Sequence, residues 1–335
     1  MKEKMSKGHF ISILFNYTNT WDIRDLIKEN SRIPIMASFF VLFLFASGLQ
    51  SQAATMGSHY PFGGEGVTAG SAPPPGFHYR GYLTFTNPTK YKDDNGDALP
   101  VDVNVDVVAT VHRFLHVTKF QILGANYAYE VVVPIVEKDV TFGALSDSKS
   151  LSLGDVFFEP LALAWNRPRW DATFTLGVYA PTGEYDSTKL ASPGLGYWSG
   201  MLTLGGTVFF DADRTLSLSA MTRTLMHTEQ DETKVTPGSE FVVEYGLGKE
   251  IGINDKLSIR PGICGSAYWQ IEDDSDDGPA TVADERKEAF SLGAEINFFW
   301  LPPKLFQLNV RVLREFGAKN TTQGSQVCLT LTKSW

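Results

Sequence analysis

The sequence has little of what marks a soluble enzyme or a secreted disulfide-rich domain. Its 335 residues include only two cysteines, which is too few for a disulfide framework. Charged residues make up only 20% of the chain, and the formal net charge of -9 argues against nucleic acid as a partner. From His78 onward no segment has a convincing helical period. The sequence therefore predicts an all-β protein.

The chain also lacks an apolar run long enough for a transmembrane helix. The apolar run that includes residues 36–45 spans about a dozen residues, against the roughly 20 that such a helix needs. Arg32 precedes this run, and small residues follow it up to Ser51-Gln-Ala53-Ala54. This arrangement is typical of a signal peptide. We predict that residues 1–54 are a targeting segment, cleaved after Ala53 or Ala54; an N-terminal membrane anchor is the alternative.

What the chain does contain is alternation of apolar and polar residues. In residues 101–111 the valines share one face, and Asp102, Asn104 and Asp106 share the other. This period of two indicates a β-strand, and strands of about 9–11 residues suit a membrane. Twelve such strands are predicted, near residues 78–86, 101–111, 117–136, 151–165, 170–180, 197–210, 215–228, 239–251, 256–271, 287–300, 305–317 and 325–335.

The predicted connections alternate between short and long. The short ones are residues 113–116, 166–169, 211–214, 254–255 and 301–304; the longer ones lie near 87–100, 137–150, 181–196, 229–238 and 272–286, with a modest one at 318–324. Outer-membrane barrels have tight periplasmic turns and longer outer loops. An even strand number places both barrel ends on the periplasmic side. Residues 78–335 are therefore predicted to form a transmembrane antiparallel up-and-down β-barrel; a soluble β-sandwich is the alternative.

The ends of the predicted strands support a membrane location. Aromatic residues gather there, as in an interfacial girdle: Trp165, Trp170, Tyr197, Trp198, Trp300 and Trp335. Trp335 shares a face with Leu331, Leu329 and Val327, which resembles the C-terminal assembly signal of outer-membrane proteins, although Lys333 departs from that pattern. The expected partners are outer-membrane lipids, lipopolysaccharide and the barrel-assembly machinery. The acidic run 272–277 indicates a solvated loop, with a loose divalent-cation contact to lipopolysaccharide as the alternative.

Residues 55–77 separate the targeting segment from the barrel. Within them, residues 57–77 hold six glycines and four prolines, a composition that opposes both helix and strand. We predict a plug-like segment inside or at the mouth of the barrel, entering from the periplasmic side; a disordered linker is the alternative. The predicted solute-contacting or gating residues are His59, Tyr60, Phe62 and Glu65. Glu65 is expected to pair with a lumen arginine such as Arg260 or Arg311.

A twelve-stranded barrel has a narrow lumen, between the filled interior of eight strands and the wide channel of sixteen. The alternation places these charged residues inside: Asp102, Asp106, Glu130, Asp171, Arg223, Glu240, Glu244, Arg260, Glu295 and Arg311. They would either form a transverse field across an open pore or pair with one another and fill it. Because acids outnumber bases, an open pore is expected to prefer cations mildly. Cys264 and Cys328 also face inward, three strands apart, and are expected to be free thiols.

Three motifs carry a resemblance to a known family. They are Gly-Ser-His-Tyr-Pro-Phe-Gly-Gly-Glu-Gly (57–66) followed by Pro-Pro-Pro-Gly (73–76), Leu-Gly-Asp-Val-Phe-Phe-Glu-Pro (153–160) with Trp165, and Ala-Pro-Thr-Gly-Glu-Tyr-Asp (180–186). From about residue 57 to its end, the chain resembles outer-membrane proteins of the phenol meta-cleavage (MetA) pathway family. The resemblance implies a β-barrel that passes hydrophobic or aromatic compounds across the outer membrane of a Gram-negative bacterium.

The predicted function is a channel for passive uptake of small hydrophobic or aromatic molecules. The alternative is a structural or surface-interacting barrel with a filled lumen. An enzyme is not expected, because no Ser/His/acid set can be assembled from the spacing. His112 and His116 are expected to flank a periplasmic turn, and His227 lies near the outer end of its strand, so no metal site or cofactor is predicted.

Overall fold

The computed structural model describes residues 57–276, 285–300 and 306–335, and within them the chain is all-β. The predicted signal peptide and the predicted turn 301–304 lie outside these residues. No helix in the described part is long and apolar enough to cross a membrane. The barrel wall consists of β1 (Gly76–Lys92), β2 (Val103–Ile122), β3 (Ala125–Phe142), β5 (Val156–Asn166), β6 (Trp170–Ala180), β7 (Ser199–Phe209), β8 (Leu216–His227), β10 (Glu240–Lys249), β12 (Leu257–Gln270), β14 (Glu288–Trp300), β15 (Phe306–Lys319) and β16 (Thr321–Ser334).

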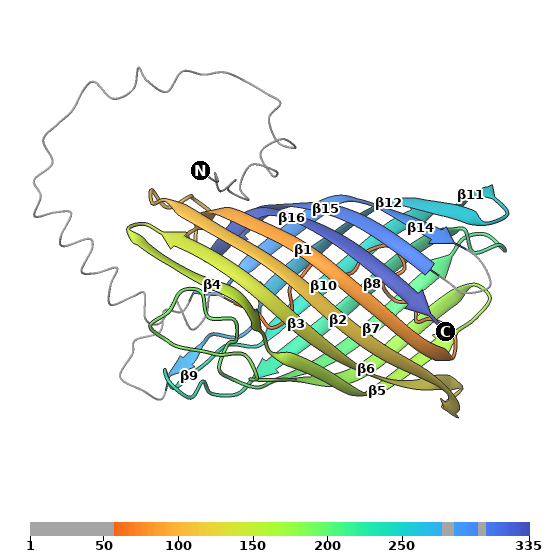
Figure 1. The fold of residues 1–335 in the computed structure, drawn as a ribbon, viewed down its shortest axis with the longest axis horizontal. Helices are drawn as coiled ribbons and strands as arrows, with labels where there is room; N and C mark the ends of the chain where they lie inside the picture. Colours follow the sequence, from red (N-terminus) through yellow and green to blue (C-terminus); the bar gives the residue numbers. More distant parts are fainter. Residues whose placement is uncertain (1–56, 277–284, 301–305) are drawn as a thin grey trace, which may run out of the picture. The chain divides into compact units, whose positions relative to one another are not determined.

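These strands form one closed antiparallel sheet (Figure 1). Strand β1 pairs with β16 from His78 opposite Ser334 to Lys92 opposite Thr321, and β10 pairs with β12. Closure removes the open strand edges that lipid cannot tolerate. Two short strands lengthen the wall, β4 (Leu145–Leu153) beside β3 and β11 (Ile251–Asn254) beside β12, and β9 (Val235–Thr236) pairs with β13 (Ser275–Asp276) outside it. The prediction of a twelve-stranded antiparallel transmembrane barrel is confirmed.

The barrel has two different ends, seen at the right and left of Figure 1. The short-turn end carries the turns at 123–124, 167–169, 210–215 and 255–256, with the start of β1 and the end of β16. The long-loop end carries residues 93–102, the β3–β4 hairpin and the loops 181–198 and 228–239. Outer-membrane barrels keep their short turns on the periplasmic side, which predicts that the short-turn end is the periplasmic one.

One predicted turn was wrong. Residues 113–116 lie inside β2, and the chain reverses at Leu123 and Gly124, whose φ angles are 51° and 74°. A two-residue hairpin of this kind needs positive φ at both positions, which glycine adopts at no steric cost. Residues 113–116 contain no glycine and could not form it. The predicted loop 137–150 was also wrong, because most of it belongs to the hairpin of β3 and β4.

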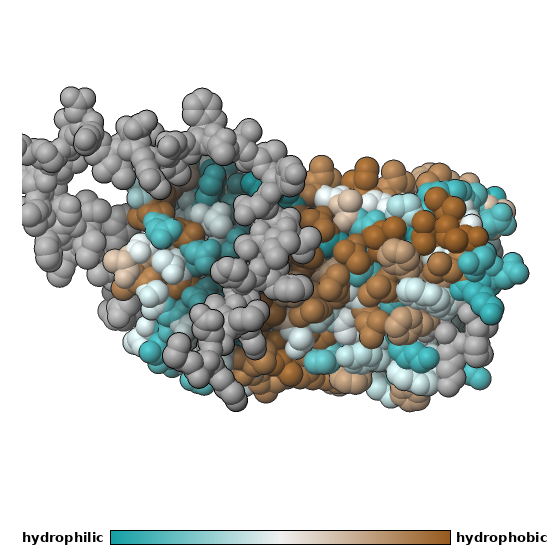
Figure 2. All heavy atoms as spheres, turned by 45° about the horizontal axis from the view of Figure 1, so that its top comes forward, coloured by the Kyte–Doolittle hydropathy of each residue, from teal (hydrophilic) through white to brown (hydrophobic). Residues whose placement is uncertain are grey.

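The outward face of the wall is apolar over the middle of the barrel (Figure 2). On β6, Trp170 is 44% exposed whereas its neighbour Asp171 is 2% exposed. The same alternation recurs on the other wall strands, which expose Leu204, Val208, Leu247, Leu292 and Val312. A continuous apolar outer band is what lipid requires.

The predicted orientation of residues 101–111 was wrong. Asp106 is exposed and accepts a hydrogen bond from Asn87 (2.5 Å), and Asp102 is also exposed, so neither is a lumen charge. Val103 instead packs inward in a cluster with Tyr91 and Phe142. This part of β2 lies at the long-loop end of a 20-residue strand, twice the roughly 9–11 residues that lipid needs. Water therefore replaces lipid outside it, and the apolar face turns inward.

Candidate functional site

Residues 57–75, here called the lumen plug, run lengthwise through the inside of the barrel. At the long-loop end, Gly57 lies against Leu195. At the short-turn end, the Ala72 carbonyl accepts a hydrogen bond from Asn166 (3.1 Å), and β1 starts at Gly76. The lumen plug thus spans the barrel from one end to the other, where the sequence predicted a segment inside the barrel or at its mouth. It forms no strand and pairs with no strand of the wall.

His59 anchors the lumen plug at its upper end. Its Nε2 lies 2.9 Å from Asp155 Oδ2, and its Nδ1 lies 2.6 Å from Ser199 Oγ. The Ser199 hydroxyl also lies 2.6 Å from His227 Nδ1. This Ser-His-Asp arrangement resembles a catalytic triad, and sequence spacing could not reveal it. Ser199 is 0% exposed, however, so no substrate carbonyl can reach its hydroxyl; the chain of hydrogen bonds joins the lumen plug to β7 and β8.

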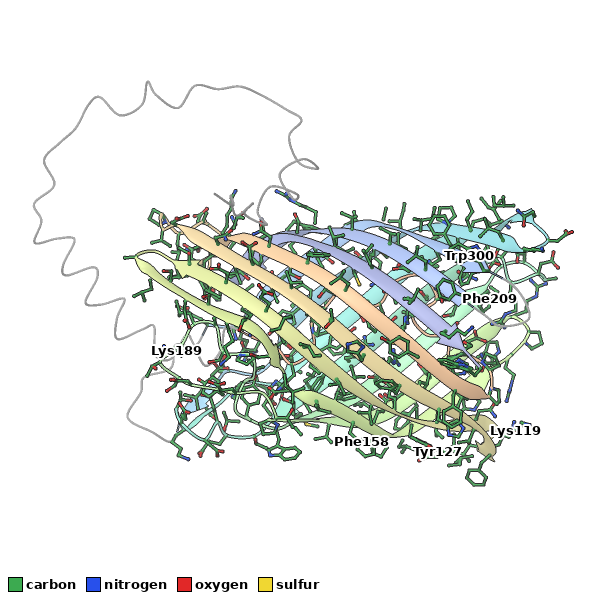
Figure 3. All side chains as sticks on the ribbon, in the orientation of Figure 1. Lys119, Tyr127, Phe158, Lys189, Phe209 and Trp300 are labelled. Atoms are coloured by element: carbon green, nitrogen blue, oxygen red, sulfur yellow. The ribbon has the colours of Figure 1, made fainter. Side chains whose placement is uncertain are left out.

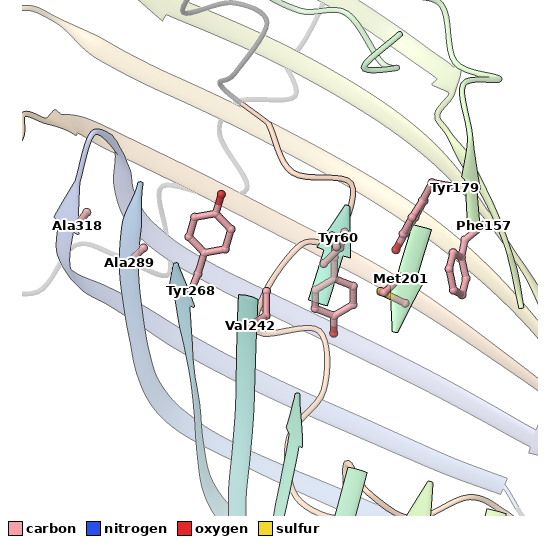
Figure 4. Packing of buried hydrophobic residues seen from close by; sticks show 9 residues of the cluster. Tyr60, Phe157, Tyr179, Met201, Val242, Tyr268, Ala289 and Ala318 are labelled. Atoms are coloured by element: carbon pink, nitrogen blue, oxygen red, sulfur yellow. The ribbon is translucent and has the colours of Figure 1, made fainter. Parts of the chain in front are cut away.

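Tyr60, the next residue of the lumen plug, lies within an apolar ring of side chains (Figure 4). The ring is made by inward side chains of the wall: Phe157, Tyr179, Met201, Leu225, Val242, Tyr268, Ala289 and Ala318. The Tyr60 hydroxyl donates to Glu244 (2.7 Å), and the Arg223 guanidinium lies 4.0 Å from the centre of its aromatic ring, a cation–π distance. Phe62 stacks on Tyr268 with ring centres 5.3 Å apart. This level of the lumen combines aromatic faces with one ion pair, Arg223 with Glu244.

Glu65 lies one level lower, in a belt of charged residues. Its carboxylate accepts hydrogen bonds from Arg80 (3.1 Å), Arg113 (3.0 Å) and the Tyr82 hydroxyl (3.2 Å). Glu65 therefore pairs with arginines of the wall, as predicted, but with Arg80 and Arg113 and not with the two examples, Arg260 and Arg311. The partners were missed because Arg113 was assigned to a turn, although it faces Glu65 from the middle of β2.

Arg311 holds the lumen plug through its backbone rather than through Glu65. It is 2% exposed, pairs with Glu295 (2.9 Å) and donates to the carbonyls of Gly63 (2.9 Å) and Gly64 (2.6 Å). Glu295 in turn accepts the amide of Val67 (3.1 Å). A buried arginine bound to a carboxylate and two carbonyls has its charge neutralised and several of its donors satisfied.

The other predicted lumen charges are also paired. Arg223 pairs with Glu244, Arg113 with Glu130 (2.6 Å) and Arg260 with Glu250 (2.5 Å). Asp171 pairs with Arg214 (2.6 Å), and Glu240 accepts the Tyr268 hydroxyl (3.0 Å). The lumen charges therefore pair with each other or hold the lumen plug, which favours the second of the two predicted arrangements.

Glycines in the wall make room for the lower half of the lumen plug. A side chain at Gly246, Gly248 or Gly262 would meet Val67, and a side chain at Gly70 would meet the backbone of Gly206. The close approach of two backbones at Gly70 leaves no space for even a methyl group. The lumen plug and the wall are thus complementary in shape.

A cavity remains at each end of the lumen plug. The one at the short-turn end has a volume of about 450 Å³ and is lined by polar residues, among them Thr68, Asp171 and Arg260. The one at the long-loop end has a volume of about 270 Å³ and is lined by Tyr60, Phe62 and wall residues of β1 to β3. Cys264 and Cys328 face the lumen as buried free thiols, as predicted.

Comparison with known proteins identifies the family of this barrel. Residues 89–331 match the profile of the family described as the MetA-pathway of phenol degradation. The chain belongs to that family. This confirms the predicted family, and the motifs at 153–160 and 180–186 lie within the matched residues.

A solved structure shows the same architecture. The crystal structure of the COG4313 outer membrane channel from Pseudomonas putida F1 is similar with a TM-score of 0.68 at 16% identity, over 80% of this chain and 98% of the other. The Pseudomonas putida toluene transporter TodX is a remote likeness, with a TM-score of 0.37 at 11% identity over 85% of this chain and 97% of the other. No curated protein matches the sequence.

Proposed function

We propose that this protein is a channel of the Gram-negative outer membrane for passive movement of small hydrophobic or aromatic molecules, and that the lumen plug is its gate. The observation that carries the proposal is the position of residues 57–75. They fill the lumen between two cavities and contribute no strand to the wall. The lumen plug can therefore leave without breaking a single hydrogen bond of the barrel ladder.

The side chains along the lumen support solutes of this class. Tyr60, Phe62 and Tyr268 present aromatic faces next to the long-loop cavity, and aromatic faces stack on flat apolar molecules. Below them, a wholly polar belt would oppose passage of such a molecule while the lumen plug is in place. Release of Tyr60 and Glu65 from their partners would open both levels together, which gives His59, Tyr60, Phe62 and Glu65 their proposed role in gating.

The belt of paired charges also explains why the lumen plug would remain in place at rest. Glu65 and the carbonyls of Gly63 and Gly64 neutralise or satisfy three wall arginines, Arg80, Arg113 and Arg311. Removing one partner from a fully buried pair costs about 3–5 kcal/mol, and less for Arg80 and Arg113, whose side chains are 24% and 26% exposed. Release of the lumen plug is therefore costly. A closed resting channel with a rarely populated open state follows.

The experiment is deletion of residues 57–74, which leaves β1 intact. Purified intact and deleted proteins are compared in planar lipid bilayers, after heat-modified electrophoretic mobility has shown that both are folded barrels. The intact protein is expected to conduct little, and the deleted protein to form steady open pores. Uptake of a radiolabelled aromatic solute into cells that express either form gives the transport readout.

Two results would contradict the proposal. If neither protein conducts, the lumen is filled without the lumen plug, and the structural or surface-interacting barrel is the better interpretation. If the deleted protein conducts ions but no aromatic solute enters faster than into cells without the protein, the proposed solute class is wrong, although the lumen plug does block the pore.

A further inference from the structure

The cavity at the long-loop end has an unusual charge for this chain. Four charged residues line it, Lys138, Lys189, Lys287 and Glu315, so cations outnumber anions by three to one. The whole chain carries a net charge of -9. Figure 3 shows Lys189 in the loops at this end, far from Lys119 and Tyr127 at the short-turn end. A positive cavity in an acidic protein calls for an explanation in terms of what enters it.

Lys287 is one of the three lysines that line this cavity. It is partly buried just before β14, and among the described residues its ammonium has no hydrogen-bond or ion-pair partner. Burial lowers the pKa of Lys287, and the negative charges of Asp274 and Glu240 oppose that effect. Asp274 accepts a hydrogen bond from the Gly238 amide (2.8 Å) and Glu240 accepts one from the Tyr268 hydroxyl (3.0 Å), so other groups hold both carboxylates in place. A partly buried cation that makes no direct ion pair is costly, and an anion in the cavity would reduce that cost.

Lys138 supplies a second cation to the cavity lining. Its Nζ donates to the carbonyl of Ser192 (2.6 Å), which ties β3 to the loop 181–198. An ammonium has three donors, so two remain for another acceptor. The single acid of the cavity, Glu315, is engaged by the amide of Gly324 (2.6 Å). The cavity thus offers more free donors than free acceptors.

One part of the lining is apolar and flat. Phe62 stacks on Tyr268, and Tyr60, Val105 and Val107 extend this apolar surface. The remaining lining includes hydroxyl and amide side chains such as Thr86 and Gln326. A cavity of roughly 150 Å³ holds a benzene molecule, so the cavity of about 270 Å³ has room for an aromatic ring with a charged substituent. It is smaller than the roughly 300–1,000 Å³ typical of drug-sized ligands.

We propose that this cavity binds a small organic anion with a flat apolar body, of which an aromatic carboxylate is the simplest member. The carboxylate lies between Lys287 and Lys138, and the ring lies against Phe62 and Tyr268. This inference rests on the proposed function, since it names the class of solute that the entrance of the channel takes. It differs from a channel for neutral hydrocarbons, which would gain nothing from two desolvated ammonium groups.

Binding is tested on the intact, folded protein in detergent, by calorimetric titration with benzoate and with its neutral isostere benzamide. Benzoate is expected to bind at least about tenfold more tightly than benzamide. Lys287→Met keeps the length of the side chain and is expected to weaken benzoate by about tenfold or more, without affecting benzamide. Lys287→Arg keeps the charge and should retain binding. Lys256→Met, which removes an exposed lysine in a short turn, is the matched control and should leave binding unchanged.

Equal binding of the two probes, or full benzoate affinity in Lys287→Met, would overturn the inference. Lys138→Met gives a second route to the same answer if Lys287→Met does not fold, because it too should weaken benzoate alone. Transport separates this inference from the proposed function. If benzamide enters cells and benzoate is not preferred, the proposed channel stands and the anion site is refuted. If benzoate binds but no solute enters, the anion site stands and the channel is refuted.

Discussion

The most informative perturbation of the gate is Glu65→Gln, which removes one negative charge and almost no volume. Glu65 is the ion-pair partner of both Arg80 and Arg113. Arg113 keeps Glu130 after the change, whereas Arg80 loses the partner that the structure gives it among the described residues. The substitution therefore leaves one inward-facing guanidinium uncompensated while the lumen plug is in place.

The size of the effect follows from the exposure of these groups. Breaking a fully buried pair costs about 3–5 kcal/mol. The side chains of Arg80 and Arg113 are 24% and 26% exposed, so solvent screening reduces that cost, and we take about 2–3 kcal/mol. At 1.4 kcal/mol for each factor of ten, the ratio of released to bound lumen plug rises by about 30- to 150-fold.

Hydrogen exchange measures this ratio even when the released state is rare. The amides of Glu65 and Val67 donate to Glu244 and Glu295, and their exchange requires the lumen plug to leave the wall. We expect their protection to fall by the stated factor in Glu65→Gln, and the open probability in bilayers to rise with it. Glu137→Gln, which changes an exposed glutamate on β3, is the matched control.

The double variant with Arg80→Gln provides the internal check. It removes the uncompensated charge as well as the carboxylate, so part of the lost protection should return. The reasoning is refuted if Glu65→Gln and Glu137→Gln exchange alike at both amides. It is also refuted if the double variant exchanges faster than the product of the two single effects.

Two substitutions and one labelling experiment test the geometry of the barrel and the lumen plug. Gly70→Val puts a side chain against the backbone of β7, so it should displace the lumen plug, raise conductance and destabilise the closed form by about 1–3 kcal/mol, whereas Gly200→Ala meets nothing within 4 Å and should change neither. Cys264 and Cys328 should each take one alkylating label after unfolding and none before, by intact mass; a missing label after unfolding would indicate a disulfide. Gly124→Val forces a side chain to φ near 74°, so the urea midpoint should fall by the equivalent of about 1–2 kcal/mol; an unchanged midpoint would place the turn elsewhere.

Much of the wall could be predicted because successive residues of a strand face lipid and the polar lumen in turn, so their side chains alternate between apolar and polar. On β6 the pair Trp170 and Asp171 identifies the two faces from sequence alone, and the structure separates them as expected. On β2 the same rule gave the wrong face for Asp102 and Asp106. The period of two is identical whether the apolar side meets lipid or meets a core above the membrane, and only the position along the strand distinguishes the two cases.

The location of the lumen plug could be predicted from the sequence, but its contacts with the wall could not. Its glycines and prolines exclude regular structure, and its aromatics argue against a simple linker. Which arginine would meet Glu65 depended on the pairing of β1 with β2, which places Arg80 opposite Arg113. A turn assigned to residues 113–116 removed Arg113 from that pairing. The triad-like contacts of His59 join residues 140 and 96 positions apart, a separation that no local pattern reports.

The closed ladder of the wall also determines what removal of the lumen plug would leave behind. The diameter of a barrel is set by its strand number and stagger, and here every neighbouring pair, including β1 with β16, is hydrogen-bonded. The lumen plug adds no strand to this ladder, so its loss cannot change the strand count or the register. Side chains of the charged belt can turn toward one another, but they cannot fill the grooves at Gly246 and Gly248, where the wall has no side chains to offer. The barrel without its lumen plug should therefore retain a pore along those glycines instead of collapsing, which is why conductance after deletion decides between a gated channel and a filled barrel.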